Sequence, residues 1–157
     1  WGGVMVFEYK DEEWVQIGKT LLGESEFDYL GDKNAVDLSE DGNIVTIGNS
    51  RRNNSSGCVR VYQLIAGEWA QLGNDIEDDT EGSHFGQSVS MSADGMVVSI
   101  GASRHNDSTG VVRVFKYSEK GNWIQMGNNI YGGKGHCLFG WPISISSDAS
   151  RLAVSST

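Results

Sequence analysis

Short stretches in which apolar and polar residues alternate with a period of two run through the whole chain. Within 57–62, Val59 and Val61 face one side of the predicted strand and the residues between them face the other. Val89 and Met91 alternate with serines in the same way. We find no stretch of 11 or more residues with the apolar stripe of an amphipathic helix. The pattern therefore predicts an all-β chain.

These strands recur with a period of about 54 residues. The segment Trp-x-Gln-x-Gly begins at Trp14, Trp69 and Trp123, so its spacings are 55 and 54 residues. A glycine-led apolar strand, a Ser-x-Asp-Gly or related turn and a Phe-Gly or Leu-Gly pair also recur in one order. The Asp-Gly pairs at 41–42 and 94–95 predict tight hairpin turns. We divide the single segment 1–157 approximately as 1–18 (a half unit), 19–73, 74–127 and 128–157 (a half unit).

The length and strand content of the repeat are typical of a β-propeller blade. We expect about three four-stranded antiparallel blades, with twelve strands in all. The elements at 85–92, 57–62, 69–73 and 139–146 resemble the FG-GAP propeller repeat, which is related to integrin α-subunit repeats. Kelch and WD-repeat propellers are close rivals, although no Trp-Asp dipeptide closes a copy and the paired glycines of kelch are missing. All three families are mostly interaction scaffolds.

Both ends of the sequence fall in the same loop of the repeat. Trp1 aligns with Ser56, and Thr157 aligns with Ser103. Three blades in an open stack leave strand edges that are prone to aggregate unless something covers them. We expect the cover to be further blades of the same longer chain or a second copy that closes a six-bladed ring, and we favour the longer chain.

Composition narrows the function. The 157 residues carry 12 Lys and Arg against 21 Asp and Glu, a formal net charge of -9, which disfavours nucleic acid as a partner. No apolar run approaches the ~20 residues of a membrane span, so we expect no membrane insertion. The sequence lacks a phosphate-binding glycine loop, a nucleophile elbow and a recurring His/Asp/Glu cluster. We therefore expect no enzyme and no cofactor, but a binding or adhesion module for a protein or glycan partner.

Two alternatives stay open. One is a structural subunit of a larger multiprotein assembly, whose neighbours cover the acidic surface and the blade edges. The other is a fragment of a propeller enzyme, for which polar residues should gather on the innermost strand. Asp37 is the one acid at that position, opposite Ser90 and Ser144. An extracellular or cell-surface location is what the resemblance to integrin repeats implies.

The strongest binding candidate is a loop that occurs twice, at 48–57 and 101–110, aligned without gaps. Function concentrates in loops that a rigid scaffold presents on one face. A tryptophan without a counterpart in the other repeats adds a surface for stacking. The candidate ligand-binding residues are Arg51, Arg52, Asn53, Arg104, His105, Asn106 and Trp141. The alternative is that Asn, Ser and Gly make turns and the arginines form ion pairs. Asn-x-Ser triplets at Asn53, Asn54 and Asn106 are candidate glycosylation sites.

Two acidic loops suggest calcium at first sight, since calcium prefers carboxylate and carbonyl oxygens. They lie at 23–28 and 77–81, but the third copy at 131–136 carries no carboxylate. We therefore expect no metal and interpret these acids as solvated. His84 and His136 precede the Phe-Gly element at different offsets, and we interpret both as solvated too.

The remaining residue types point to structure. Trp14, Trp69 and Trp123 occupy one repeat position, which predicts packing between blades. Cys58 and Cys137 lie in different elements of different repeats and lack metal-ligand spacing. Their spacing leaves open whether the two thiols are oxidised.

Overall fold

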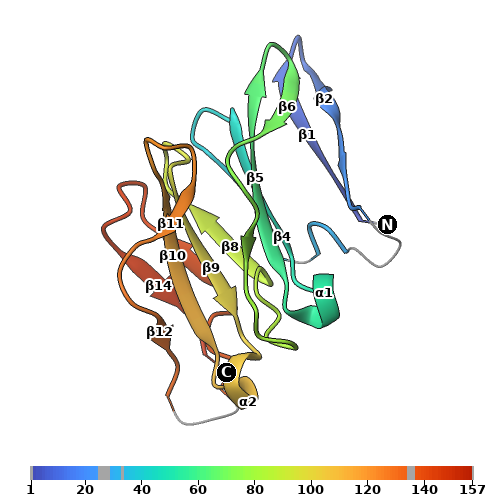
Figure 1. Ribbon diagram of the computed structural model, residues 1–157. Helices are drawn as coiled ribbons and strands as arrows, with labels where there is room; N and C mark the ends of the chain where they lie inside the picture. Colours follow the sequence, from blue (N-terminus) through green and yellow to red (C-terminus); the bar gives the residue numbers. More distant parts are fainter. Residues whose placement is uncertain (1, 25–28, 33, 134–136, 157) are drawn as a thin grey trace.

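The computed structural model describes residues 2–24, 29–32, 34–133 and 137–156 (Figure 1). Its strands are β1 (Gly3–Lys10), β2 (Glu13–Leu22), β3 (Val36–Leu38), β4 (Ile44–Asn49), β5 (Cys58–Ile65), β6 (Glu68–Gln71), β7 (Ile76–Glu77), β8 (Ser88–Met91), β9 (Val97–Ala102), β10 (Val111–Tyr117), β11 (Trp123–Gln125), β12 (Ile130–Tyr131), β13 (Ile143–Ile145) and β14 (Leu152–Val154). Two single helical turns, α1 (Arg52–Ser55) and α2 (His105–Ser108), precede β5 and β10. The expectation of an all-β chain is confirmed. Within the described ranges, no helix has the length and apolar character needed to cross a membrane.

The strands form four separate sheets in which every pairing between neighbouring strands is antiparallel. β1 pairs with β2, and β13 pairs with β14. The two larger sheets run β3-β4-β5-β6 and β8-β9-β10-β11, with β7 on β5 and β12 on β10. The described strands number 14 rather than the expected twelve, because the outer strand is interrupted at 72–75 and at 126–129 and so forms β6 with β7 and β11 with β12.

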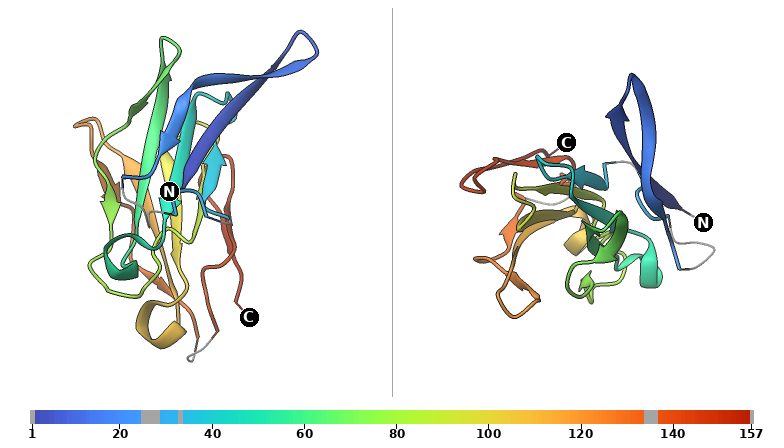
Figure 2. Two further views of the ribbon diagram at one scale, coloured as in Figure 1. Left: turned by 90° about the vertical axis from the view of Figure 1, so that its right-hand side faces the viewer. Right: turned by 90° about the horizontal axis from the view of Figure 1, so that it is seen from above.

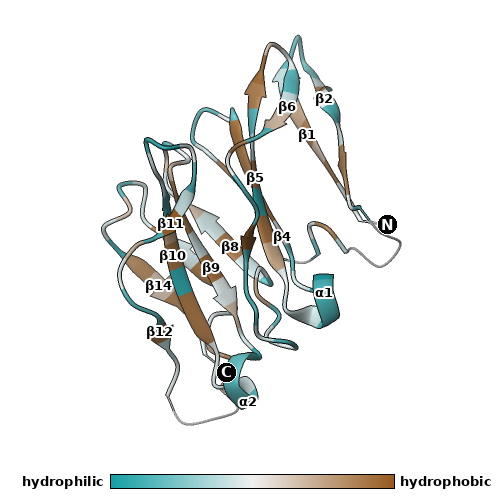
Figure 3. Ribbon diagram, in the orientation of Figure 1, coloured by the Kyte–Doolittle hydropathy of each residue, from teal (hydrophilic) through white to brown (hydrophobic). Residues whose placement is uncertain are grey.

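The sheets lie side by side in chain order, as the view from above shows (Figure 2). β3 and β4 pack on β8, and β13 packs on β8 and β9, so successive repeats lie face to face. The first and last sheets are not joined to each other in the described part of the chain. Apolar residues are concentrated in strands such as β4, β5 and β10, and the α1 and α2 turns are polar (Figure 3).

The Ser-x-Asp-Gly turn is held by its own side chains. The Ser39 hydroxyl donates to Asp41 Oδ1 at 2.6 Å and accepts the Ile44 N–H at 2.9 Å. The hydrogen bonds of Ser39 and Asn43 lower the pKa of Asp41 to about 2. Gly42 takes the positive φ that the turn requires, at 70°. The predicted hairpin is confirmed, since this turn joins the antiparallel strands β3 and β4.

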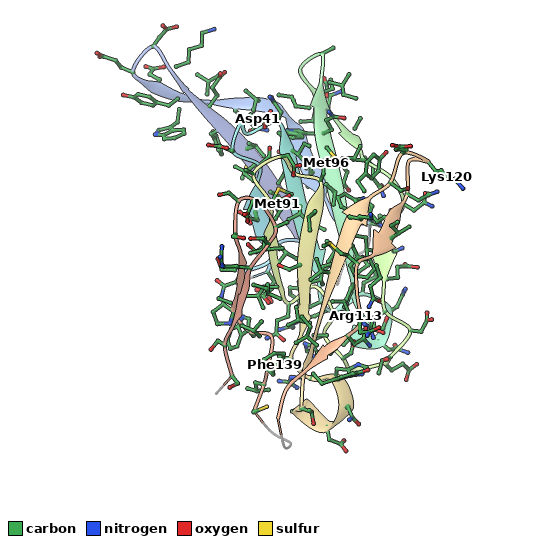
Figure 4. All side chains as sticks on the ribbon, turned by 90° about the vertical axis from the view of Figure 1, so that its left-hand side faces the viewer. Asp41, Met91, Met96, Arg113, Lys120 and Phe139 are labelled. Carbon is green, nitrogen blue, oxygen red and sulfur yellow. The ribbon has the colours of Figure 1, made fainter. Side chains whose placement is uncertain are left out.

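The Phe-Gly pair at 85–86 connects its own sheet to the previous one. The Phe85 side chain is fully buried, and its backbone pairs with Gly57 through a parallel bridge. Gly48 lies so close to the Gly86 carbonyl oxygen that a Cβ at residue 48 would overlap it. In Figure 4, Phe139 of the next Phe-Gly pair lies near one end of the sheets and Asp41 lies near the other. The α1 and α2 turns lie at the Phe-Gly end (Figure 1).

The predicted packing of the repeated tryptophans is confirmed at two positions. Trp69 Nε1 donates to the Ile17 carbonyl oxygen at 3.0 Å, and Trp123 Nε1 donates to that of Leu72 at 2.8 Å. Each indole therefore bonds to the outer strand of the preceding sheet. Trp14 is 68% exposed and no sheet precedes β1–β2 in the described chain, so its packing between blades stays a prediction.

Candidate functional site

A small polar cleft lies between the second and third repeats, close to the α1 and α2 turns. Its volume is about 80 Å³. Its walls come from the ends of β4 and β9 and from the segments that lead into β3 and β8. The lining residues are Asp32, Ser50, Arg51, His84, Gln87 and Arg104. The stacking of two sheets thus brings Arg51 and Arg104 of the repeated loop together, as side chains of one cleft.

Arg51 and Arg104 occupy the residue just before each helical turn. The Arg51 guanidinium lies 4.5 Å from the centre of the Tyr29 ring, and its Nη2 is 3.9 Å from Asp32 Oδ2. The Arg104 backbone N–H donates to the Ser83 carbonyl oxygen at 3.2 Å, which places that loop against the next one. Two arginines against one aspartate make this cleft locally positive on an otherwise acidic chain.

His84 is the residue that the sequence interpretation missed. It lines the cleft and is half-buried, so its interpretation as a solvated side chain is wrong. Its backbone N–H donates to the Ser55 carbonyl oxygen at 2.9 Å, and its own carbonyl oxygen accepts the Gln87 N–H at 3.0 Å. Burial lowers the pKa of His84, and the charges of Arg104 and Arg51 lower it further. The imidazole is therefore neutral at pH 7 and able to accept a proton.

Arg52 points away from this cleft into an ion-pair cluster. Its guanidinium is hydrogen-bonded to Asp75 and lies 3.5 Å from Glu24. Arg60 contacts the same two carboxylates at 2.9 Å each. Arg52 Nη1 also lies 3.3 Å from the Cys58 sulfur. For Arg52, the alternative interpretation as an ion-pair former describes the geometry, and its predicted role in binding a ligand stays a prediction.

His105 belongs to a similar cluster in the next repeat. Arg113 Nη1 lies 3.2 Å from Asp78 Oδ1, and His105 Nδ1 lies 3.8 Å from Asp78 Oδ2. Figure 4 labels Arg113 toward the Phe-Gly end of the sheets. The Asp78 side chain is only 4% exposed, so the prediction of solvated acids in 77–81 is wrong at this residue. The pKa of Asp78 is lowered overall. Desolvation by burial acts to raise this pKa, but the hydrogen bond from Ser83 and the charge of Arg113 outweigh that effect. Of the other acidic loop, residues 25–28 lie outside the described ranges.

The other candidate residues lie outside the cleft. Asn53, Asn54 and Asn106 are exposed, and the glycosylation and binding assigned to them stay predictions. Trp141 is half-buried beside β13, where it occupies the repeat position of the cleft residue Gln87. Its binding role is likewise still a prediction.

Asp37 on the innermost strand and the two cysteines have structural surroundings that explain them. Asp37 Oδ2 accepts the Met91 backbone N–H at 2.8 Å, so this acid links two sheets. Cys58 and Cys137 are free thiols, and burial raises the pKa of Cys58. Within the described ranges, we find no group of three or more His, Cys, Asp or Glu side chains that could hold a metal ion. His136 lies outside those ranges.

The arrangement can do two things chemically. The two guanidinium groups can bind an anion such as a phosphate or carboxylate. The neutral imidazole of His84 can take a proton from a hydroxyl group or a water molecule held beside that anion. No other part of the described chain combines paired cations with a histidine of lowered pKa.

Comparison with known proteins finds similarity among solved structures. No family model matches the chain, and no curated protein matches its sequence. Among solved structures, a candidate 6-phosphogluconolactonase from Bacteroides uniformis is similar over 83% of this chain, with a TM-score of 0.57 and 19% sequence identity. The match spans 35% of the length of that protein. At this identity the likeness concerns the fold.

This match corrects several expectations. The assignment to the FG-GAP and integrin-like family is wrong, since the structural likeness leads instead to a protein named as a lactonase. The name of the same similar protein contradicts the interpretation as a non-catalytic adhesion or scaffold module and the expectation of no enzyme. Of the alternatives left open by the sequence, the fragment of an enzyme agrees better with this likeness. Short repeat motifs misled because they specify packing between sheets, and packing is shared by proteins of unlike function.

Proposed function

We propose that this chain is part of a β-propeller enzyme and that its repeats are propeller blades. Two sheets of four consecutive antiparallel strands, each from a unit of about 54 residues, support the blade assignment. The fold shared with a protein named as a lactonase supports the enzyme assignment. The observation that carries the proposal is the cleft in which Arg51 and Arg104 from adjacent sheets meet His84.

The substrate class follows from the charge of this cleft together with the name of the similar protein. A phosphorylated sugar lactone is a small anion whose phosphate suits a pair of guanidinium groups. Arg51 and Arg104 are both exposed at the surface, so the phosphate can reach them without opening the fold. Asp32, 3.9 Å from Arg51, keeps that side chain near the cleft until an anion replaces it.

The reaction would be hydrolysis of the lactone ester. Water adds to the carbonyl carbon, the bond from that carbon to the ring oxygen breaks, and the product is a hydroxy acid. His84, uncharged at neutral pH, accepts the proton of the attacking water and returns it to the leaving ring oxygen. A cleft shared by two blades accounts for the spread of these groups over two repeats.

The test separates binding from hydrolysis. Binding of 6-phosphogluconate, the expected product, is measured by titration calorimetry, and lactone hydrolysis is followed against the spontaneous rate. We expect the Arg51→Ala/Arg104→Ala double variant to weaken binding by at least roughly 100-fold, since the two charge-assisted contacts contribute about 1.5–3 kcal/mol each. His84→Ala should abolish the catalysed rate and leave binding within about threefold. Lys120→Ala, at an exposed hairpin tip, is the control.

The pH profile supplies a further readout. Because the pKa of His84 is lowered from the ordinary 6.5, the catalysed rate should fall in acid with its half-maximal point at a pH below 6.5. A rate equal to the spontaneous one at every pH, together with binding of 6-phosphogluconate that the arginine substitutions do not change, would refute the proposal.

A further inference from the structure

A second groove, larger than the cleft, lies between the outer strands of the two five-stranded sheets. Its volume is about 350 Å³. One wall is formed by β7 and the residues just before it, and the other by β10 and the start of β11. Both walls belong to the sheets in the middle of the chain, away from the first and last sheets. Six of the lining residues carry polar or aromatic side chains: Asn74, Asp75, Glu77, Phe115, Asn122 and Trp123.

An amide pair joins the two walls of this groove. Asn74 Nδ2 donates a hydrogen bond to Asn122 Oδ1 at 3.1 Å. Both residues are exposed, and among the described residues Asn74 Oδ1 and Asn122 Nδ2 have no hydrogen-bond partner. An asparagine amide can accept through its oxygen and donate through its nitrogen. The pair therefore offers an acceptor and a donor, side by side, to a ligand in the groove.

The same contact between sheets is an ion pair at the preceding junction. Lys19 and Glu68 occupy the repeat positions of Asn74 and Asn122. Lys19 Nζ lies 3.4 Å from Glu68 Oε1. The stacking of the sheets is compatible with either pair, so packing alone does not require two amides at the second junction.

The charges around the groove disfavour a charged ligand. Among the described residues that line it there is no lysine or arginine, so an anion would find no counter-charge. Asp75 is hydrogen-bonded to Arg52 and Arg60, and Glu77 Oε1 lies 3.5 Å from Arg52 Nη1. Glu24 contacts the same two guanidinium groups, at 3.5 and 2.9 Å. A cation would have to compete with these arginines for the carboxylates, which leaves an uncharged ligand as the best match.

Two half-buried aromatic side chains give the groove an apolar surface. Trp123 Nε1 donates to the Leu72 carbonyl oxygen at 2.8 Å, so the indole offers ring carbons rather than a free donor. The Phe115 ring, which meets that of Phe85 edge-on at 6.3 Å, lines the groove as well. Ligand sites commonly combine such apolar surface with a few polar groups that fix orientation. A sugar ring matches this combination, because its faces carry C–H groups and its rim carries hydroxyl groups.

We propose that this groove binds an uncharged pyranose sugar. The sugar ring lies against Trp123 and Phe115. Its hydroxyl groups donate to Glu77 and to Asn74 Oδ1, and they accept a hydrogen bond from Asn122 Nδ2. The binding groups thus come from two adjacent repeats.

This groove is separate from the cleft that holds His84. The two share no lining residue, and the groove has no cation in its described walls. The inference goes beyond the proposed lactone hydrolysis, and it holds whether or not the cleft is catalytic.

Saturation-transfer difference NMR with the 157-residue chain tests the ligand class. The probes are the methyl glycosides of glucose, galactose and mannose, together with the amino sugar and the uronic acid of each. We expect at least one neutral glycoside to bind with a dissociation constant in the millimolar range. Failure of all three neutral glycosides to bind would overturn the proposal. Tighter binding of an amino sugar or a uronic acid would overturn the assignment to an uncharged ligand.

Exchanging the amide pair for the ion pair of the preceding junction tests the place of binding. Asn74→Lys/Asn122→Glu keeps a contact between the sheets and removes both amides, so it should weaken binding at least about fivefold, the equivalent of two lost hydrogen bonds. Urea unfolding checks that the variant is folded. Lys19→Asn/Glu68→Asn is the matched control and should leave binding unchanged. Unchanged binding by the Asn74→Lys/Asn122→Glu variant would place the sugar elsewhere and overturn the proposal.

The carboxylate of the groove has its own matched control. Glu77 is half-exposed, so Glu77→Ala should leave the fold intact and weaken sugar binding by about tenfold or more, because a hydrogen bond to a charged group is lost. Leu22→Ala, at the same position of the preceding repeat, should have no effect. The Arg51→Ala/Arg104→Ala variant should also bind the neutral sugar normally. Loss of sugar binding in that variant would assign the sugar to the cleft and overturn the proposal, whereas failure of lactone hydrolysis alone would not affect it.

Discussion

Truncation of Phe85 tests whether the Phe-Gly element is structural. The side chain is fully buried, its ring meets that of Phe115 edge-on at 6.3 Å, and the Arg113 guanidinium lies 5.6 Å from its centre. A buried aromatic side chain removes about 150–250 Å² from water at about 25 cal/mol/Å², which is roughly 4–6 kcal/mol. Since alanine keeps a small part of that area, Phe85→Ala should lower the free energy of unfolding by about 3–5 kcal/mol.

Urea unfolding followed by tryptophan fluorescence measures this loss. With a slope of about 2 kcal/mol/M, a loss of about 4 kcal/mol lowers the midpoint by about 2 M. Ile65→Ala is the control, because Ile65 is 56% exposed and its truncation should cost less than about 0.5 kcal/mol. If Phe85→Ala unfolds within about 1 kcal/mol of Ile65→Ala, the assignment of Phe85 to the core between the sheets is refuted.

Two further predictions concern charge and backbone packing. Although desolvation raises the pKa of Asp75, hydrogen bonds from Arg60 and others outweigh it and leave the pKa below the ordinary 3.8. The carboxylate therefore stabilises the fold fully above about pH 5, and this stabilisation is lost as the pH falls through the folded pKa. The stability difference between wild type and Asp75→Asn should shrink in acid; a constant difference from pH 7 to pH 3 would contradict this. Gly48→Ala should cost at least about 2 kcal/mol in urea unfolding, because its Cβ overlaps the Gly86 carbonyl oxygen, whereas Gly133→Ala has open space and serves as the control.

Local chemistry made the strands and turns predictable. Alternation places Val59 and Val61 on one side of β5, and both are fully buried. The Ser-x-Asp-Gly element carries within four residues the hydroxyl, carboxylate and glycine that close its turn, so it forms the same way around Asp41 and Asp94. Such features depend on neighbours in sequence, which a reader of the sequence can see.

The candidate site was predictable only in part. The repeated loop pointed to Arg51 and Arg104, but it pointed equally to Arg52, which turns to Asp75 instead. Adjacent residues on a tight turn face different directions, and the sequence alone does not say which direction meets another sheet. His84 was interpreted as solvated because no histidine recurs at its position in the other repeats, so no periodic signal marked it as a site residue.

By itself the sequence determined that this chain is a β-repeat with a period of about 54 residues, because strand alternation and turn geometry are encoded over a few neighbouring positions. Only the tertiary structure decided what those repeats bring together. The stacking of sheets places His84 beside arginines 33 and 20 positions away in the chain, Arg51 and Arg104, and their charges lower its pKa. It also leaves Trp14 exposed while burying its counterparts more deeply, because burial depends on which sheet lies opposite.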